Sequence, residues 1–149
     1  MTEVRAIEFE IIKEPWNKYQ IQDNSVLKTR TILKKVNRVT DGDKIGFNID
    51  AQTLTVIHAD PSLKGEPNPK PVTNEEIQKS IEKSDMRYDT LAQEFNEYEL
   101  DDGTKIKIYT NVTSISKSNL KDRSGDPIYF VQSSNQVEIK PASHYNPQK

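Results

Sequence analysis

Two short motifs in the chain combine aromatic rings with an amide side chain, a combination suited to holding a flat or extended ligand. The motifs lie in opposite halves of the chain, and their six residues are Trp16, Asn17, Tyr19, Phe95, Asn96 and Tyr98. An aromatic ring offers an apolar surface to a peptide, a sugar or a base, and an asparagine beside it can donate and accept hydrogen bonds. We therefore take these six residues as candidate contacts for a protein partner. The alternative is that the rings fill the core while the asparagines hold turns or strand ends.

A basic stretch follows the first motif and has no acidic residue within it. Its five cations are Lys28, Arg30, Lys34, Lys35 and Arg38. Because alternate residues of a strand share a face, Lys28, Arg30 and Lys34 can line one exposed surface and grip the phosphates of a nucleic acid. The alternative is a charged solvent face that protects the edge of a sheet from pairing.

The corresponding part of the second half carries acidic residues instead. They are Glu94, Glu97, Glu99, Asp101 and Asp102. Opposite charges on two related surfaces favour their association, so we expect the halves to complement each other within one chain or between chains.

Residue constellations for catalysis or metal binding are missing from the sequence. The chain has no cysteine, which removes thiolate ligands and thiol nucleophiles. Two histidines, His58 and His144, are too few for a zinc or catalytic cluster. The five glycines form no phosphate-binding loop, and acidic pairs such as Asp41 and Asp43 are typical of turns. The sequence therefore predicts no catalytic residue, no metal site and no cofactor.

The composition places the chain between a globular and a disordered class. Only 33% of its residues are hydrophobic, its mean hydropathy is −0.82, and its net charge is −2. The apolar residues alternate with polar ones, which favours a folded and strongly solvated protein. A net charge near zero argues against a general nucleic-acid or membrane-surface binder. With no cysteine, no signal-like start and no run near the ~20 apolar residues of a membrane span, we expect a cytoplasmic protein.

The two motifs belong to a longer internal repeat. Thr31 corresponds to Thr110 at the same spacing that separates Trp16 from Phe95. A later block, 42–47, matches 125–130 at a wider spacing, so a few extra residues are expected in one connecting loop of the second copy. We interpret the chain as one β-rich unit duplicated in tandem.

The elements that would position these residues are short strands joined by turns. Alternation of apolar and polar residues predicts a strand over 6–12 and one long strand after each motif. Four or five strands are expected in each unit. Short strands at regular spacing are typical of a small β-barrel or β-sandwich, so we predict a mainly β fold built from two such modules.

The apolar phase slips once in each long strand. Leu33 is followed by Val36, and Val112 is followed by Ile115. A spacing of three cannot arise from a period of two, whereas a β-bulge inserts one residue and re-aims the side chains. The sequence therefore predicts a bulge at the same place in both copies, near 34–35 and 113–114.

The segment between the copies has a different composition. Half of the eight prolines lie within 59–71, which indicates an extended linker or an ordered crossing loop. Thr73 followed by Glu76 forms a capping-box pattern and predicts a short helix over about 74–84. The predicted division is a first β-module at 1–58, the linker and helix at 59–84, a second β-module at 85–140 and a flexible tail at 141–149.

The sequence Glu14-Pro15-Trp16-Asn17-Lys18-Tyr19, followed by an aspartate turn and a basic strand, resembles small uncharacterised prokaryotic, chiefly archaeal, proteins with a Trp-Asn-x-Tyr repeat. The resemblance covers the repeated blocks and implies no activity.

These observations favour a non-enzymatic binding or assembly module that presents two related surfaces to a protein partner. Two linked sites can bind with avidity, which gives a duplicated surface its use. The alternative is a nucleic-acid-binding small β-barrel protein that uses the strand 28–38. A third hypothesis is the binding of a small molecule or carbohydrate by exposed aromatic rings. Salt dependence separates the first two hypotheses, because phosphate binding weakens steeply as the salt concentration rises. The solvent exposure of Trp16 tests the leading contact site, because a buried indole could not touch a partner.

Overall fold

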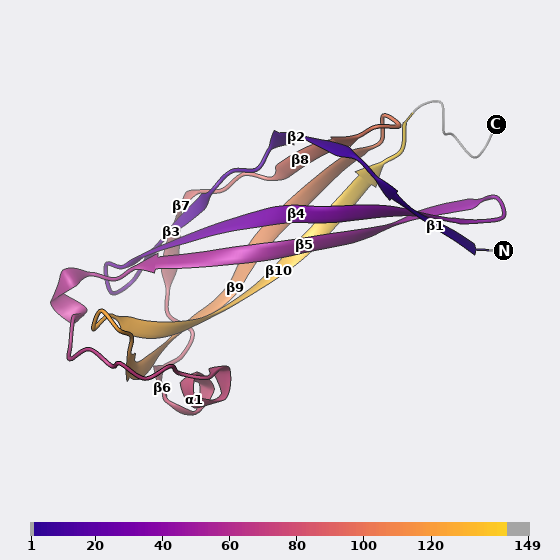
Figure 1. Ribbon diagram of the computed structural model, residues 1–149. Helices are drawn as coiled ribbons and strands as arrows, with labels where there is room; N and C mark the ends of the chain where they lie inside the picture. The colour runs from indigo at the N-terminus through magenta and orange to yellow at the C-terminus, as the bar shows by residue number, and fades with distance from the viewer. Residues whose placement is uncertain (1, 143–149) are drawn as a thin grey trace.

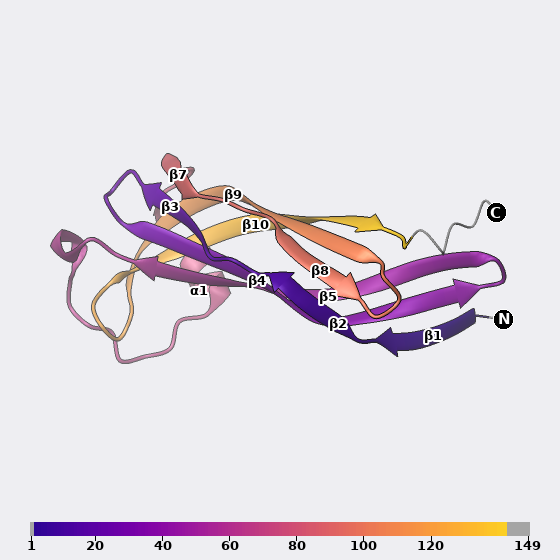
Figure 2. The same cartoon turned by 90° about the horizontal axis from the view of Figure 1, so that it is seen from above.

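Two antiparallel five-stranded sheets form most of the computed structural model, which describes residues 2–142. The first sheet contains β1 (Thr2–Ile7), β3 (Asn17–Ile21), β4 (Val26–Asp41), β5 (Lys44–His58) and β7 (Tyr88–Ala92). The second sheet contains β2 (Phe9–Lys13), β6 (Ile81–Lys83), β8 (Asn96–Leu100), β9 (Lys105–Lys121) and β10 (Pro127–Lys140). The two sheets form the two layers of an elongated molecule (Figures 1 and 2). The prediction of a mainly β chain is confirmed; the predicted tail lies, from residue 143 on, outside the described residues.

Each sheet is built around one long β-hairpin, β4–β5 in the first sheet and β9–β10 in the second. β4 and β9 have 16 and 17 residues, whereas most strands have about three to ten. β4 pairs along one side with β5 and along the other with β3 and then β1. β9 pairs in the same way with β10 on one side and with β8 and β6 on the other. β5 and β10 are therefore edge strands of the two sheets.

Two strands, β2 and β7, cross to the sheet of the other half. β2 pairs with β8, with Phe9 opposite Leu100, and β7 pairs with β3, with Tyr88 opposite Ile21. Phe9 and Tyr88 lie 79 residues apart, and so do Ile21 and Leu100, so the two pairings match at one sequence spacing. Each sheet thus takes one strand from the other half of the chain, and the sheets do not follow the predicted division into two modules.

The strand predicted over 6–12 is split at Glu8. The chain leaves the first sheet after β1 and enters the second sheet with β2. The carbonyl of Glu8 accepts a hydrogen bond, 3.0 Å long, from the backbone N–H of Asp101 in the turn that follows β8. The alternation of residue types continues across this point, which is why the pattern indicated one strand.

The predicted β-bulges are confirmed in both long strands. In β4 the register shifts between Leu33 and Lys35, so that Lys34 is the extra residue. In β9 Val112 and Ser114 pair with consecutive residues of β10, so that Thr113 is the extra residue. The bulges return the following apolar side chains to the core.

The two hairpin turns keep the wider spacing predicted between blocks 42–47 and 125–130. Farther along the hairpins the spacing between matching residues is shorter. Gly42 and Gly125 occupy both turns with φ of 62° and 86°, which favours glycine. A second register shift follows Pro127. Beyond it, Phe47 lies opposite Arg38 as Tyr129 lies opposite Lys117, so Phe47 corresponds to Tyr129 rather than to Phe130.

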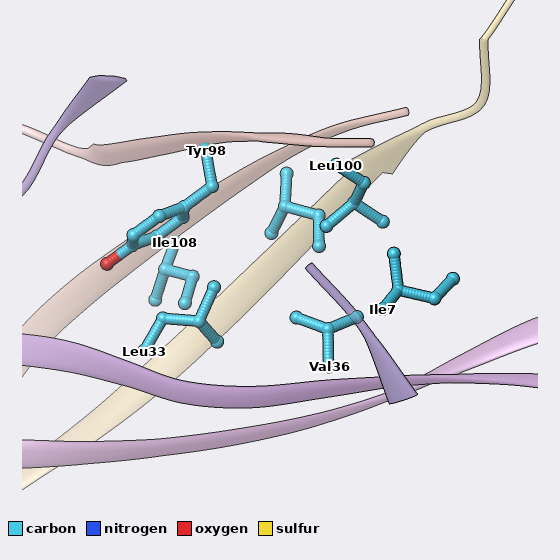
Figure 3. Packing of buried hydrophobic residues seen from close by; sticks show 7 residues of the cluster. Ile7, Leu33, Val36, Tyr98, Leu100 and Ile108 are labelled. Atoms are coloured by element: carbon cyan, nitrogen blue, oxygen red, sulfur yellow. The ribbon is translucent and has the colours of Figure 1, made fainter. Parts of the chain in front are cut away.

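The core lies between the sheets in two clusters, and each cluster draws on both sheets. One consists of Ile7, Leu33, Val36, Tyr98, Leu100, Ile106 and Ile108. The other consists of Tyr19, Ile21, Leu27, Met86, Val112 and Ile115. Figure 3 shows the side chains of β1 and β4 directed toward those of β8 and β9. Because apolar burial is the dominant favourable term in folding, these clusters hold the two layers together.

The helix in the connecting segment is shorter than predicted. α1 covers Asn74–Lys79, and the hydroxyl of Thr73 accepts a hydrogen bond from the N–H of Glu76, 3.2 Å away, as the capping pattern predicted. The helix does not continue to residue 84, because Ile81 pairs with Ser118 as the first residue of β6.

The proline-rich crossing is an ordered loop. It contains a 3₁₀ turn, η1 (Pro61–Leu63), and its backbone bonds to the β9–β10 turn. The N–H of Gly65 donates to the carbonyl of Gly125 at 2.7 Å, and the N–H of Asn68 donates to that of Asp122 at 2.9 Å. The crossing and α1 thus lie at the β9–β10 end of the molecule (Figure 1).

Candidate functional site

The outer face of the first sheet carries an exposed indole among cations. Asn17 and Tyr19 point inward, so their alternating neighbours Trp16 and Lys18 belong to the outer face. Across the sheet, Lys18 lies opposite Lys28 and Lys28 opposite Val56, while Arg30 lies opposite Leu54. We name this surface the Trp16 face; its residues are Trp16, Lys18, Lys28, Arg30, Leu54 and Val56. Trp16 is 38% exposed and Val56 is 39% exposed.

Arg30 is held in place on the Trp16 face by a buried carboxylate. Its guanidinium carbon lies 5.8 Å from the ring centroid of Trp16, and its Nη2 lies 3.4 Å from Oε1 of Glu14. The side chain of Glu14 is only 5% exposed. Its Oε2 accepts hydrogen bonds from the hydroxyl of Tyr98 at 2.7 Å and from the N–H of Leu33 at 3.3 Å. A fixed guanidinium loses less side-chain entropy when it binds an anion.

The phenol of Tyr98 stays protonated in this arrangement. Burial raises the pKa of Tyr98 above its ordinary value, and the hydrogen bond to the Glu14 carboxylate raises it further. Tyr98 therefore acts as a donor, and it connects the core of the second sheet to the Trp16 face through Glu14 and Arg30.

Four of the six predicted partner contacts are buried. They are Asn17, Tyr19, Asn96 and Tyr98, with exposed fractions of 4%, 2%, 3% and 0%. Asn96 donates from Nδ2 to the carbonyl of Thr31 at 2.6 Å, and Asn17 accepts from the N–H of Glu94 at 2.9 Å. The Asn96 bond joins the two sheets, the Asn17 bond holds the segment between β7 and β8, and all four side chains meet almost no solvent, as the core-filling alternative states. The candidate contacts for a partner narrow to Trp16 and Phe95.

The ammonium groups of two lysines pack on the ring of Phe95. The Nζ of Lys13 lies 3.8 Å from the ring centroid of Phe95, and that of Lys107 lies 4.7 Å from it. The ring of Tyr109 also packs against Phe95, with ring centroids 5.5 Å apart. Each ring thus has intramolecular cations beside it: two ammonium groups lie close to Phe95, whereas the Arg30 guanidinium lies farther from Trp16, at 5.8 Å, and leaves the indole 38% exposed.

The five cations predicted as a nucleic-acid surface do not share one face. Lys28 and Arg30 lie on the Trp16 face, Lys34 is the bulge residue, and Lys35 lies opposite Asp50. Arg38 points inward and donates to a carboxylate oxygen of Asp102. Lys18 joins Lys28 and Arg30 instead. The alternation of Lys18 with the buried Tyr19 is the sequence signal that could have identified Lys18 as a cation of this face.

Ion pairs between the sheets join the two halves. The Nζ of Lys117 lies 3.3 Å from Oδ2 of Asp23, and Arg38 pairs with Asp102. The two aspartates lie 79 residues apart, and so do the two cations. These ion pairs carry the charge complementarity that was expected between the two halves. Glu97 and Glu99 instead lie opposite Lys107 and Lys105 of their own sheet.

Hydrogen bonds lower the pKa of both buried aspartates. Burial alone would raise the pKa of Asp23, but hydrogen bonds from Tyr129, Ser25 and Lys117 outweigh it. Burial likewise opposes the ionised form of Asp102, and bonds from Thr104 and Arg38 lower its pKa below the ordinary value. Both carboxylates are therefore charged at neutral pH and hold the sheets together.

A groove lies between the edge strands at the α1 end. It has a volume of about 480 Å³ and is lined by Thr55, Ile57, Asn74, Asp122, Asp126, Pro127, Ile128, Tyr129, Phe130 and Val131. One oxygen of Asp122 accepts the N–H groups of Ser124 and Asp126 at 2.8 Å and 3.0 Å. This carboxylate thus closes the predicted turn. No group of three metal-binding side chains was found among residues 2–142.

Comparison of the chain with family models, with curated proteins and with solved structures finds no match. None of the helices in the described part of the chain has the length and apolar character needed to cross a bilayer.

Proposed function

We propose that this chain is a non-enzymatic binding module that presents the Trp16 face to a protein partner. The observation that carries the proposal is a tryptophan, 38% exposed, on the outer side of a sheet whose inner side already forms the core. Exposed tryptophans fixed beside arginines are typical hot spots of protein interfaces. The neighbouring Leu54 and Val56 extend the apolar contact.

The proposal includes a tandem duplication of one β-unit, which supplies the second, related surface around Phe95. Its support is the agreement of register and contact at the same spacing. The β3–β4 pairing of Asn17 with Thr29 corresponds to the β8–β9 pairing of Asn96 with Ile108. The exchanged strands, the bulges and the inter-sheet ion pairs correspond in the same way. A partner with two equivalent segments could engage both surfaces with avidity once its second segment displaces Lys13 and Lys107 from the ring of Phe95.

The charge of the Trp16 face defines the chemistry of the partner segment. Lys18 and Lys28 share this face with the indole, Arg30 lies beside its ring, and Glu14 already bonds to Arg30 and Tyr98. Complementary charge sets specificity and the rate of encounter. The fitting partner is therefore a segment that combines carboxylates with a leucine-like or aromatic side chain.

Titration with synthetic peptides tests this proposal through the fluorescence of Trp16, the single tryptophan of the chain. One series carries Asp, Glu and Leu, and matched series replace the acids by amides or the leucines by serine. We expect only the acidic and apolar series to shift the emission. Arg30→Gln should weaken binding, whereas Arg123→Gln, on the exposed β9–β10 turn, should not. Equal binding of the amide series would contradict the proposal.

Single-stranded nucleic acid is the second candidate ligand. The specific observation is that three cations and a stacking ring share the Trp16 face, an arrangement that binds phosphates and bases together. An oligonucleotide titration at several salt concentrations separates the candidates. Steep salt dependence together with loss of about 1–3 kcal/mol in Trp16→Ala would favour nucleic acid. Binding of oligonucleotides without binding of acidic peptides would overturn the protein-partner proposal.

A further inference from the structure

β5 leaves a long sheet edge open. It has 15 residues, and β4 is its pairing partner within the part of the chain that the structure describes. Natural edge strands are usually short, or interrupted by proline or a bulge, because unpaired N–H and C=O groups accept another strand. β5 contains no proline, and the bulge in its hairpin lies on β4 at Lys34. Its edge is therefore free to extend the sheet.

The first half of β5 is the most accessible part of this edge. β5 meets β10 near its middle, where Asn135 donates to the hydroxyl of Thr53 at 3.3 Å. Before that point the β4–β5 hairpin extends past the end of the second sheet (Figures 1 and 2). The corresponding edge of β10 begins with Pro127 and lies near α1, which packs on β10.

We propose that the occupant of this edge is a second copy of the chain, with the two β5 strands antiparallel and centred on Phe47. In this register Lys44 of each copy lies opposite Asp50 of the other, and Ile45 lies opposite Ile49. Opposite charges directly across a pair of strands are favourable, as are two β-branched side chains. The segment 44–50 is thus its own complement in sequence.

Neighbouring registers lack this complementarity. A displacement by two residues places Lys44 opposite Asn48 or Gln52, so that neither ammonium meets a carboxylate. A displacement by one residue turns the core side of one strand toward the solvent side of the other, which breaks the apolar face. The charge pattern therefore selects one register, and it favours this chain over an unrelated peptide.

The pairing joins the first sheets of two copies into one continuous sheet. Ile45, Phe47 and Ile49 lie on the core side of the strand, since Phe47 and Ile49 pack against the buried cluster. Ile45 is 43% exposed in the single chain and would gain cover. A twofold axis perpendicular to the sheet makes the interface isologous. Both Trp16 faces then point to the same side.

Molar mass measured by light scattering over a series of protein concentrations tests the pairing. The wild-type chain should pass from monomer to dimer as its concentration rises. Lys44→Asp and Asp50→Lys each place like charges opposite at two symmetry-related points, so each should weaken the dimer roughly tenfold. The double variant Lys44→Asp/Asp50→Lys restores opposite charges and should restore the dimer.

Glu138→Lys on the edge strand β10 is the matched control and should dimerise as the wild type does. Circular dichroism and the melting temperature report whether each variant folds, because Lys44 also faces Asp41 and Asp50 also faces Lys35 in their own sheet. A wild-type chain that stays monomeric at every concentration overturns the proposal. So does a dimer that both single variants form equally well, or one that the double variant fails to restore.

Discussion

The hydroxyl groups of Thr31 and Thr110 hydrogen-bond to each other between the two sheets. Each threonine also bonds along its own sheet, Thr31 to Thr53 at 2.9 Å and Thr110 to Asn135 at 2.7 Å. Thr31 and Thr110 lie 79 residues apart, the spacing that also separates Trp16 from Phe95. Their contact places a small polar network inside an apolar core.

Removing one hydroxyl from this network should cost stability. Thr31→Val removes one hydrogen-bond partner from Thr110 and one from Thr53, both of which keep Asn135, and the expected loss is about 1 kcal/mol of unfolding free energy. Urea denaturation monitored by Trp16 fluorescence and circular dichroism measures it. The double variant Thr31→Val/Thr110→Val should lose less than the sum of the single variants, because the two hydroxyls share one interaction. Strict additivity would show that they do not interact.

Acid should separate the sheets through the buried aspartates. The pKa values of Asp23 and Asp102 are lower in the folded protein than in the unfolded chain. Their contribution is therefore fully present above the unfolded pKa of about 4 and is lost as the pH falls through the lower folded pKa. Asp23→Asn/Asp102→Asn should be less stable at neutral pH and should show a flatter decline in stability below a pH of about 4. Denaturant midpoints at a series of pH values measure this slope; an unchanged slope would contradict the assignment.

Anionic quenchers should reach the indole more readily than cationic ones. Trp16 is 38% exposed and its ring centroid lies 5.8 Å from the guanidinium carbon of Arg30. The local positive potential raises the concentration of iodide and lowers that of caesium. Stern–Volmer constants for the two ions should therefore differ, and Arg30→Gln should reduce the difference. Quenching by neither ion would show that the indole is covered in solution.

The β4 bulge can be tested by deleting its extra residue. Without Lys34, Val36 follows Leu33 at a spacing of two, so Val36 and Arg38 keep facing inward in a regular strand. The deletion should therefore retain a cooperative unfolding transition, whereas in a strand without a bulge it would turn both side chains outward. Lys34→Ala keeps the bulge and should change stability by less than about 0.5 kcal/mol. Calorimetry of both variants measures the transitions, and loss of the cooperative transition in the deletion variant would contradict the prediction.

The local patterns of the sequence predicted most of the elements, the turns and both bulges, because these depend on neighbouring residues. The glycine and asparagine turns illustrate this, since Asn24 and Gly103 take φ of 71° and 88° at corresponding positions. The partner of each strand was not predictable in the same way. β2 and β7 resemble each other in pattern, so alternation alone cannot state which of the two sheets each one joins.

The sequence predicts part of the candidate site but assigns its residues to the wrong faces. The prediction places Trp16, Asn17 and Tyr19 on one contact surface, although neighbouring strand residues face opposite sides of a sheet. Alternation assigns Trp16 and Lys18 to one side and Asn17 and Tyr19 to the other. The role of Glu14 could not be inferred, because its partners Arg30 and Tyr98 lie 16 and 84 residues away.

The exchange of β2 and β7 has a consequence for the order in which the chain acquires its structure during synthesis. β3 is synthesised early, but its partner β7 begins only at Tyr88. In the same way, β2 can pair only after β8 has been synthesised. A nascent chain that ends before residue 88 holds an incomplete layer with its inner side uncovered. Both sheets are therefore completed together, late in translation. A chain on a ribosome stalled midway would expose apolar surface, which is prone to aggregation and is bound by chaperones.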